Sequence, residues 1–264
     1  MSKRDITPAD AAPSLTPQEE LRLALFLVMA GRGGTGKTLL LRWICERALK
    51  AARAVVIADG DRTNRSLPLF LEGVLAPPGA NDPIVWRWLE AIVERMVAER
   101  FNLILDLGGG DLVLKQMAIE LALQSLLERH GIGPVILHLL SPEVESLAYL
   151  ASLEDNGLFA PQRTALILNE GLVPRGYDSD EAVFAPVREH RVFKAAIRRG
   201  AVPIVMPRLG PAPAINARHL SFADAAAGNT KAGLPPLNIF DRQRVLLWLD
   251  AMEAAFAPVT EWLP

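Results

Sequence analysis

The sequence predicts an α/β fold in which helices flank a doubly wound, mostly parallel sheet. Six short apolar runs are continuous rather than alternating, which is typical of strands that are buried on both faces. Segments of helical composition separate these runs, so strand and helix alternate along the chain. The chain has 264 residues, of which 50% are hydrophobic, and this is enough for the core of one large domain.

The expected strands span residues 23–30, 54–58, 103–107, 134–140, 164–168 and 202–206. The expected helices between them span residues 39–51, 84–100, 112–130, 143–156 and about 187–199. A last helix at about 240–256 carries Val245, Leu249, Met252 and Phe256 along one face, which we expect to pack on the body. Residues 207–236 are rich in Pro, Gly and Ala and predict a long irregular connection.

The domain organisation predicted from these elements is simple. We expect a flexible N-terminal tail at 1–20, a single domain at 21–257 and a short C-terminal tail at 258–264. No apolar leader and no run of 18 apolar residues is present, so we expect a cytoplasmic protein without a membrane anchor. Cys45 is the one cysteine, which excludes an internal disulfide, and the net charge of −2 gives no global basic field.

The turn after the first strand carries the strongest signal. Residues 31–38 read G-R-G-G-T-G-K-T and match the phosphate-binding pattern G-x-x-x-x-G-K-[ST]. Backbone N–H groups of such a loop cradle phosphate oxygens, so Gly33, Gly34, Thr35 and Gly36 are predicted to bind phosphate. Lys37 would reach the β- and γ-phosphates, and the Thr38 hydroxyl would bind Mg²⁺. An apolar strand before the loop and a helix after it predict the architecture of a P-loop NTPase.

Carboxylates follow the second expected strand. Asp59 and Asp61 stand at its carboxyl end, and ligands of open α/β sheets bind at that end of the strands. One carboxylate can hold Mg²⁺ through its water shell, and the other can orient a water molecule for attack on the γ-phosphate. An Asp- and Gly-rich turn without a ligand is the alternative interpretation.

Two later strands also end in polar residues. Asp106 ends the third strand before three glycines, as in the Walker B arrangement in which an Asp assists Mg²⁺, whereas Asp111 fits the N-cap of the next helix. Asn169 follows the fifth strand, and its amide has the donor and the acceptor needed to read a base edge. A simple turn residue at the end of the strand is the alternative for Asn169.

These segments together resemble the ParA/MinD family of P-loop ATPases, which carry a deviant Walker A loop. The family loop K-G-G-x-G-K-[ST] is similar to residues 32–38, and the family D-x-D segment followed by Asn is similar to Asp59, Asp61 and Asn64. The Asp–Gly segment and the late Asn resemble Asp106 and Asn169. The resemblance covers roughly residues 23–206, and its first motif is its most specific one.

The resemblance implies an ATPase with Mg²⁺ as its metal. Lys37 and Thr38 would bind the phosphates and Mg²⁺, with Asp59 and Asp106 supporting the metal. Asp61 would position the attacking water, and Asn169 would contact adenine. Two subunits of the family close around two ATP molecules, so the resemblance also implies an ATP-dependent homodimer.

Arg32 is a departure from the family, which has a lysine at this position. Arginine keeps the charge and adds a planar fork that suits phosphate, so Arg32 can act across the dimer as an arginine finger does. A plain surface role, with weak or altered hydrolysis, is the alternative. The spacing of Asn64 after Asp61 is a second departure, because it does not match every family member.

The family positions cargo such as plasmid or chromosomal DNA, division-site proteins or other assemblies, often with a protein activator or adaptor. If residues 187–199 form one helix, its basic side chains lie within roughly 140° of arc and can track DNA phosphates. These side chains are Arg188, Arg191, Lys194, Arg198 and Arg199. An ordinary solvated helix face is the alternative. The last helix lacks the basic polar face that membranes attract, so no membrane partner is expected.

Two other functions stay open at this point. A small-molecule enzyme on the same scaffold, resembling dethiobiotin synthetase, would transfer a phosphoryl group or ligate a substrate held beside the γ-phosphate. Gly33 and Gly34 disfavour it, because small residues there suit the close approach of a partner. A weakly hydrolysing nucleotide-binding scaffold is the third possibility, which Arg32 keeps open.

Overall fold

The computed structural model describes residues 23–62, 65–108, 112–154, 157–174, 180–230 and 233–264. Six strands form one sheet in the order β2-β3-β1-β4-β5-β6, and every neighbouring pair is parallel. The strands are β1 (Ala24–Ala30), β2 (Val55–Asp59), β3 (Asn102–Asp106), β4 (Ile132–Leu140), β5 (Arg163–Asn169) and β6 (Val202–Met206). The predicted fold class and all six predicted strands are therefore confirmed, and the tail expected at 1–20 lies outside the described residues.

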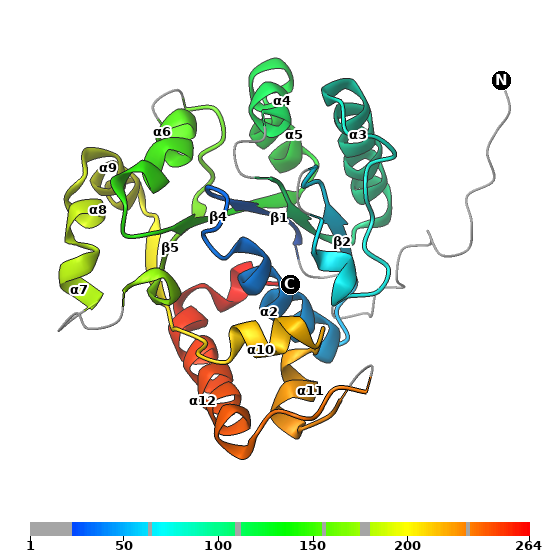
Figure 1. Ribbon diagram of the computed structural model, residues 1–264. Coiled ribbons are helices and arrows are strands. Elements are labelled where there is room, and N and C mark those ends of the chain that lie inside the picture. Colours follow the sequence, from blue (N-terminus) through cyan, green and yellow to red (C-terminus); the bar gives the residue numbers. More distant parts are fainter. Residues whose placement is uncertain (1–22, 63–64, 109–111, 155–156, 175–179, 231–232) are drawn as a thin grey trace, which may run out of the picture.

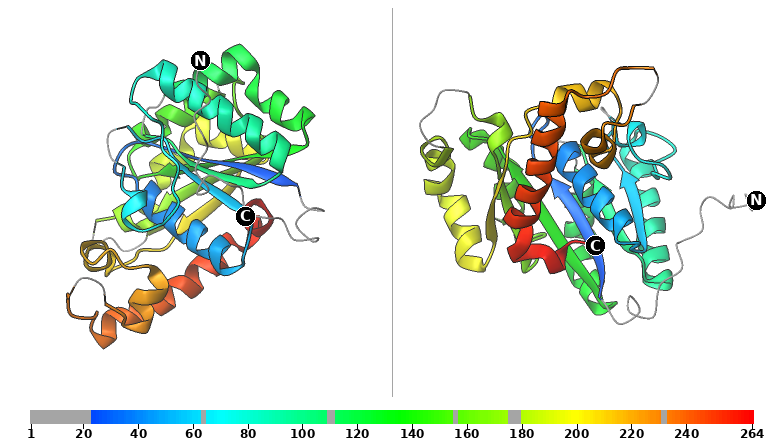
Figure 2. Two further views of the ribbon diagram at one scale, coloured as in Figure 1. Left: turned by 90° about the vertical axis from the view of Figure 1, so that its right-hand side faces the viewer. Right: turned by 90° about the horizontal axis from the view of Figure 1, so that it is seen from below.

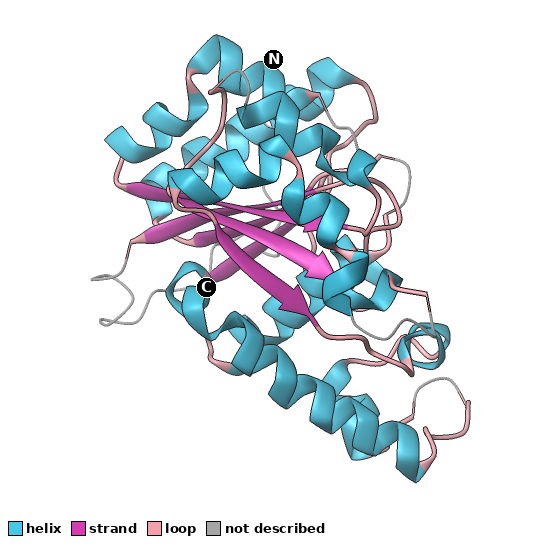
Figure 3. Cartoon of the chain, turned by 90° about the vertical axis from the view of Figure 1, so that its left-hand side faces the viewer, coloured by secondary structure: helices cyan, strands magenta, loops and turns pink. Residues whose placement is uncertain are grey.

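Helices cover both faces of this sheet (Figure 1). One face packs on α2 (Lys37–Lys50), α10 (Ala212–Ala217), α11 (Phe222–Ala227) and α12 (Ile239–Phe256). The other face packs on α3 (Asp82–Glu99), α4 (Val113–Leu121), α5 (Leu123–Arg129), α6 (Ala148–Glu154), α8 (Ala185–Glu189) and α9 (Arg191–Arg199). Figure 3 shows the sheet between these two layers. The short helices η2 (Leu67–Leu69), η3 (Val144–Leu147), η4 (Glu170–Leu172) and α7 (Asp180–Val183) lie in the connections.

Side chains of β1 alternate between the two cores. Leu25, Leu27 and Met29 join the core on the α2 side, and Phe26 and Val28 join the core on the α3 side. Because both faces are covered, every residue of β1 is buried, and this explains why its sequence is apolar without alternation.

Two helices predicted as continuous are each divided in two. Residues 112–130 form α4 and α5, which separate at Ala122, where φ is 47° and the left-handed backbone ends the first helix. Residues 187–199 fall on α8 and α9, which separate at His190, whose extended backbone and imidazole cap the second helix at Val192 N. Alanine is the best helix former, so the sequence at Ala122 carries no breaking signal.

The long irregular connection predicted at 207–236 is also wrong in part, because it contains α10 and α11. Ser221 caps α11 by accepting a hydrogen bond from Asp224 N, and Gly228 ends it with φ of 80°. Arg42 and Glu46 of α2 hold this segment in place. The Arg42 guanidinium donates to Asn216 Oδ1 and to Leu220 O, both at 2.7 Å, and Glu46 Oε2 accepts from Phe222 N at 2.8 Å.

Arg42 is enclosed by aromatic rings. Its guanidinium lies 3.6 Å from the ring centre of Phe70 and 4.6 Å from that of Phe222, and the side chain is 1% exposed. Burial raises the pKa of Glu46 to about 7 although Arg42 and backbone N–H groups oppose the shift. Two ionisable side chains of α2 therefore both bond to the segment that carries α10 and α11.

The C-terminal helices lie against the α2 side of the sheet (Figure 2). In α12, Val245, Met252 and Phe256 are buried as predicted, Leu249 is partly buried, and Trp248 adds to the buried face. The final helix η5 (Ala257–Trp262) brings Val259 and Leu263 into the same core. Within the described ranges, no helix has the length and apolar character needed to cross a membrane.

Candidate functional site

The loop of residues 31–38 leaves the carboxyl end of β1 and enters α2 at Lys37. Three of its glycines have positive φ: 142° at Gly31, 79° at Gly34 and 96° at Gly36. A Cβ atom on Gly31 would lie 2.6 Å from Leu139 O, and one on Gly36 would lie 2.6 Å from Asn169 Nδ2. The loop therefore requires glycine at these two positions for backbone conformation and for space.

Lys37 is folded onto the loop itself. Its Nζ donates to Gly31 O at 3.1 Å and to Arg32 O at 2.9 Å, and the side chain is 7% exposed. Thr35 Oγ1 also donates to Arg32 O, at 2.8 Å. Burial lowers the pKa of Lys37, and the nearby carboxylates of Asp106 and Asp61 oppose this shift. The ammonium group is thus placed among acidic side chains at the carboxyl edge of the sheet.

Asp59 and Asp106 end two neighbouring strands in register, and both are buried. Burial raises the pKa of Asp106 to about 7; Asp59 and Asp61 raise it further and Lys37 opposes them. Burial also raises the pKa of Asp59. Asp106 Oδ1 has no hydrogen-bond partner among the described residues, which is costly for a buried carboxylate oxygen.

Asp61 and Thr38 complete this group of side chains. Asp61 N donates to Asp59 Oδ1 at 3.0 Å, and a Cβ on Gly108 would lie 3.0 Å from Asp61 Oδ1. The Asp61 carboxylate therefore lies against the backbone that follows β3. Thr38 Oγ1 lies 3.3 Å from Ser66 Oγ. Asn64, which belongs to the family resemblance, and Asp111, which was predicted to cap the next helix, lie outside the described residues.

The donor set fits Mg²⁺ only in combination with a bound phosphate. No group of three or more His, Cys, Asp or Glu side chains in the described ranges can hold a metal by itself. Mg²⁺ usually binds one or two carboxylates and completes its shell with waters and phosphate oxygens. The unpartnered Asp106 Oδ1, the neighbouring Asp59 and the Thr38 hydroxyl are oxygen donors of this kind.

Asn169 joins the end of β5 to the loop. Its Nδ2 donates to Thr35 O at 2.7 Å, and its Oδ1 accepts from Gly171 N at 2.8 Å. The second bond is that of an Asx turn, as the simpler interpretation of this residue expects. One N–H of the amide and one lone pair are left over for another partner.

A hollow of about 360 Å³ opens beside Asn169. Its walls include Gly36, Leu172, Arg208 and Pro213, which come from the loop, from the end of β5 and from the segment after β6. Sequence reasoning missed Arg208 and Pro213, although their place after the carboxyl end of β6 is a signal for a ligand-facing position.

A second hollow of about 360 Å³ lies on the other side of the loop. It is lined by Thr38, Ser66, Arg42, Phe70, Asn216 and His219, so α10 forms one of its walls. Sequence reasoning missed this hollow because it treated residues 207–236 as an irregular connection.

The outer side of the loop is open. A Cβ atom on Gly33 or Gly34 would meet no atom within 4 Å, and the Arg32 side chain is exposed. Packing inside the described chain therefore does not demand the small residue at Gly33, whose φ is not positive.

The basic residues predicted to share one helix face are spread more widely. Arg188 is on α8 and the others are on α9, because the helix is broken at His190. Arg199 points inward, where it pairs with Glu154 and donates to Ala160 O, Pro161 O and Thr164 Oγ1. Lys194 pairs with Glu189, while Arg191 and Arg198 are exposed. The single stripe of five cations is thus wrong in its geometry.

No protein-family model and no curated protein matches the chain. Solved structures with a similar fold include chloroplast FtsY from Physcomitrella patens, with 19% identity and a TM-score of 0.45, over 90% of this chain and 68% of that one. The MinC:MinD cell division complex of Aquifex aeolicus has 17% identity and a TM-score of 0.47, over 85% of this chain and 96% of that one. FtsY from Elizabethkingia anophelis in complex with GDP has 12% identity and a TM-score of 0.43, over 74% of this chain and 58% of that one. All three TM-scores are below 0.5, so a function for this chain has to come from the geometry of its site.

Proposed function

We propose that this chain binds ATP and Mg²⁺ at residues 31–38, hydrolyses the ATP, and forms a homodimer in the ATP state. The observation that carries the proposal is the buried Asp106 Oδ1, which has no hydrogen-bond partner among the described residues. The Asp106 carboxylate is also close enough to Lys37 to raise the pKa of that lysine against the effect of burial. A phosphate loop beside an unsatisfied carboxylate is what a magnesium nucleotide would complete.

Each side chain of the carboxyl edge has a role in this proposal. Thr38, Asp59 and Asp106 would hold Mg²⁺, which neutralises charge on the phosphates when it is bound. Lys37 would exchange the carbonyl oxygens of Gly31 and Arg32 for phosphate oxygens, which are stronger acceptors because they are charged. Asp61, held against Gly108, would orient the attacking water.

The base would lie in the hollow beside Asn169. The free N–H and lone pair of Asn169 can read a base edge there, and Arg208 and Pro213 would flank the base. Adenine is our choice from the family resemblance, and a direct comparison of ATP with GTP affinity tests it.

The open outer side of the loop supports the dimer. Gly33 and Gly34 leave space for a second subunit, and the exposed Arg32 can reach the partner's phosphates with its planar fork. The cargo of the switch would be DNA or another assembly, reached through a protein adaptor or through the exposed cations Arg191 and Arg198.

The test is the solution mass of Asp61→Ala, measured by light scattering with Mg-ATP and with Mg-ADP. Loss of the water-orienting carboxylate should slow hydrolysis, so the ATP-bound dimer should persist while the ADP-bound protein stays monomeric. Asp250→Ala, which changes an exposed carboxylate on α12, is the matched control and should behave as wild type. A monomer in both nucleotides, with ATP binding shown by a fluorescent analogue, would contradict the switch.

The hollow between Thr38 and α10 favours a second candidate function, phosphoryl transfer to a small molecule. Ser66, Arg42, Asn216 and His219 provide polar groups there, and the hollow begins at the expected Mg²⁺ ligand. Such an enzyme would turn over steadily as a monomer, and Asn216→Ala would lower its turnover without changing ATP affinity. A scaffold that hydrolyses little would instead bind ATP with negligible turnover in wild type.

A further inference from the structure

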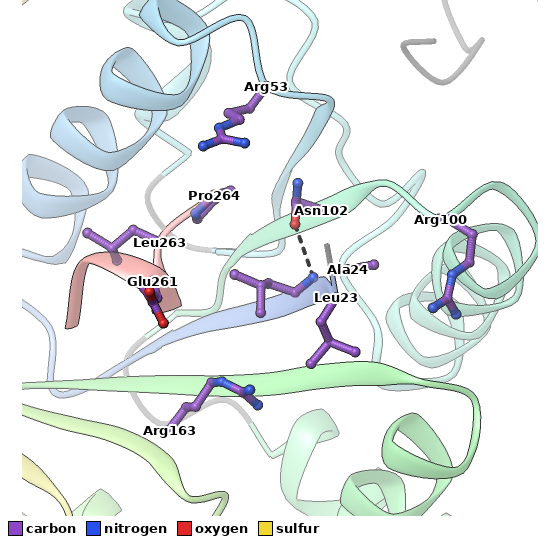
Figure 4. A pocket seen from close by; sticks show the side chains of 10 residues that line it. Leu23, Ala24, Arg53, Arg100, Asn102, Arg163, Glu261, Leu263 and Pro264 are labelled. Atoms are coloured by element: carbon purple, nitrogen blue, oxygen red, sulfur yellow. Dashed lines mark hydrogen bonds between the residues drawn. The ribbon is translucent and has the colours of Figure 1, made fainter. Parts of the chain in front are cut away.

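A third hollow lies at the amino ends of the strands, at the opposite edge of the sheet from the phosphate loop (Figure 4). It measures about 330 Å³, and its lining includes Leu23 and Ala24 at the start of β1 and Asn102 at the start of β3. Seven residues of β1 separate it from the loop, roughly 20 Å at about 3.3 Å per residue. One nucleotide bound at the loop therefore does not fill it.

Arginines line this hollow from several directions. Arg53 precedes β2, Arg163 opens β5, and Arg100 follows α3. Figure 4 shows Arg53 on one side, Arg163 on the other, and the start of β1 between them. Arg100 already donates to His130 O at 2.6 Å and to Gly131 O at 2.8 Å, and these two carbonyl oxygens do not neutralise its charge.

Arg53 and Arg163 differ from the other half-buried arginines. Within the described ranges, each other arginine of intermediate exposure has a polar or charged partner. Neither Arg53 nor Arg163 has an ion pair or a side-chain hydrogen bond to a described residue. Glu261 also lines the hollow, but it is exposed and pairs with neither of them. Both guanidinium groups are partly exposed, and no described side chain neutralises either of them, so an anion in the hollow would gain two charge-assisted partners.

The sequence makes room for one of these guanidinium groups. Gly133 lies inside β4, and a Cβ atom there would be 3.2 Å from the Arg163 Nη1 atom and 2.6 Å from Leu23 Cδ2. A glycine inside a strand weakens it, and close approach by another group is a common reason for it. The space above Gly133 is where Arg163 extends toward the hollow.

We propose that this hollow binds a small anion with two oxyanion groups, one held by Arg53 and the other by Arg163. Three strands, β3, β1 and β4, lie between β2 and β5, and neighbouring strands are about 4.8 Å apart. Because Arg53 and Arg163 approach from opposite sides of the hollow, an anion that presents charge at two places, such as a diphosphate or a dicarboxylate, can face both of them. The planar fork of arginine matches both phosphate and carboxylate oxygens.

The probe is pyrophosphate without Mg²⁺, titrated calorimetrically into Lys37→Ala, which removes the phosphate loop as a competing site. One site per chain is expected, and Arg53→Gln and Arg163→Gln in the same background should each weaken it at least about tenfold. Arg87→Gln removes an exposed arginine of α3 and should leave the affinity unchanged. Orthophosphate should bind at least about tenfold more weakly than pyrophosphate, and succinate in place of pyrophosphate distinguishes a dicarboxylate from a diphosphate ligand.

The result that overturns the proposal is an absence of binding by both pyrophosphate and succinate, or an affinity that the two arginine substitutions leave unchanged. Thermal unfolding of each variant identifies any that fail to fold, and Arg163→Lys then serves as a milder change that keeps the charge but loses the fork. The site is independent of the proposed ATP switch. Pyrophosphate binding that disappears only in Lys37→Ala belongs to the loop. Pyrophosphate binding that disappears only in the arginine variants belongs to this hollow.

Discussion

At the carboxyl edge of the sheet one lysine lies among three carboxylates, whereas at the amino edge three arginines and one exposed glutamate line a hollow. At the carboxyl edge, Lys37 lies among Asp59, Asp61 and Asp106, its Nζ donates to the loop, and Asp59 Oδ1 accepts from Asp61 N. At the amino edge, Arg53 and Arg163 extend into one hollow without partners in the described chain. The carboxylates of the first edge suit a metal together with an anion, while the excess of arginines at the second edge suits an anion alone.

The largest expected effect is that of Lys37→Ala on nucleotide affinity. Removing the ammonium leaves phosphate charge without its partner, so the affinity for Mg-ATP should fall at least about a hundredfold, or about 3 kcal/mol. Lys50→Ala, at the exposed end of the same helix, should have no effect. Fluorescence titration with a labelled ATP measures both. Equal affinity for Mg-ATP in the two variants would contradict a role for Lys37 in binding phosphate at the carboxyl edge.

Two glycines of the phosphate loop should differ in how much their substitution changes stability. Gly36→Ala places a Cβ atom 2.6 Å from Asn169 Nδ2 at a φ of 96°, and should lower the free energy of unfolding by roughly 2 kcal/mol. Gly33→Ala meets no atom within 4 Å and should stay within about 0.5 kcal/mol of wild type. Urea denaturation measures both values. If Gly33→Ala instead blocks the ATP dimer while it keeps ATP affinity, the open side of the loop faces a partner.

Glu46 provides an internal reference, because burial and groups of the chain itself set its pKa. Its pKa is about 7 in the folded protein and lies near 4.5 when unfolded, so the folded state binds the proton more tightly. Stability should therefore fall as the pH rises from about 4.5 to about 7, by up to roughly 2 kcal/mol after allowance for solvent, and stay low above that. Arg42 and Asp224 are the charged groups that act on Glu46.

Thermal unfolding between pH 5 and pH 8 tests this expectation. Glu46→Gln should flatten the decline, and it should leave pyrophosphate binding at the amino edge unchanged. A wild-type decline that survives in Glu46→Gln would assign the pH dependence to another group.

The smallest effect is expected on the affinity for DNA. Arg191→Glu with Arg198→Glu should weaken ATP-dependent DNA binding and reduce the slope of log affinity against log salt by about two. Arg87→Glu with Arg129→Glu changes two exposed arginines elsewhere and is the matched control. Anisotropy titrations at several salt concentrations give the slopes. An equal loss in both double variants would indicate a general charge effect instead of a binding face.

The two edges also differ in how far the sequence predicts them. The phosphate loop and the carboxylates at the ends of β2 and β3 follow from local pattern, because glycine spacing and position after a strand carry the signal. The amino edge has no such pattern: Arg53 and Arg163 are 110 positions apart, and only the strand order brings them to one hollow. Arg208 was missed for a related reason, since its relevance depends on β6 lying next to β5.

The helices also differ from the prediction where tertiary contacts determine the structure. The break at Ala122 was missed because alanine favours the continuous helix, and α10 and α11 were missed because Pro and Gly were interpreted as loop signals throughout 207–236. The contacts of Arg42 and Glu46 with this segment are tertiary. Tertiary contacts of this kind decide a structure where local propensity is weak.

The hydrogen bond from Asn169 to Thr35 O has a consequence for selectivity between nucleotides. Because the same amide borders the proposed base hollow and bonds to the loop that we propose to bind phosphate, a base that draws Asn169 away from Thr35 would weaken phosphate binding. The reverse also holds, since coupling between two sites is reciprocal in free energy. A base that does not fit would then lower the affinity in two ways, through its own contacts with Asn169 and through weaker phosphate binding by the loop. One amide would thereby couple the two ends of the nucleotide.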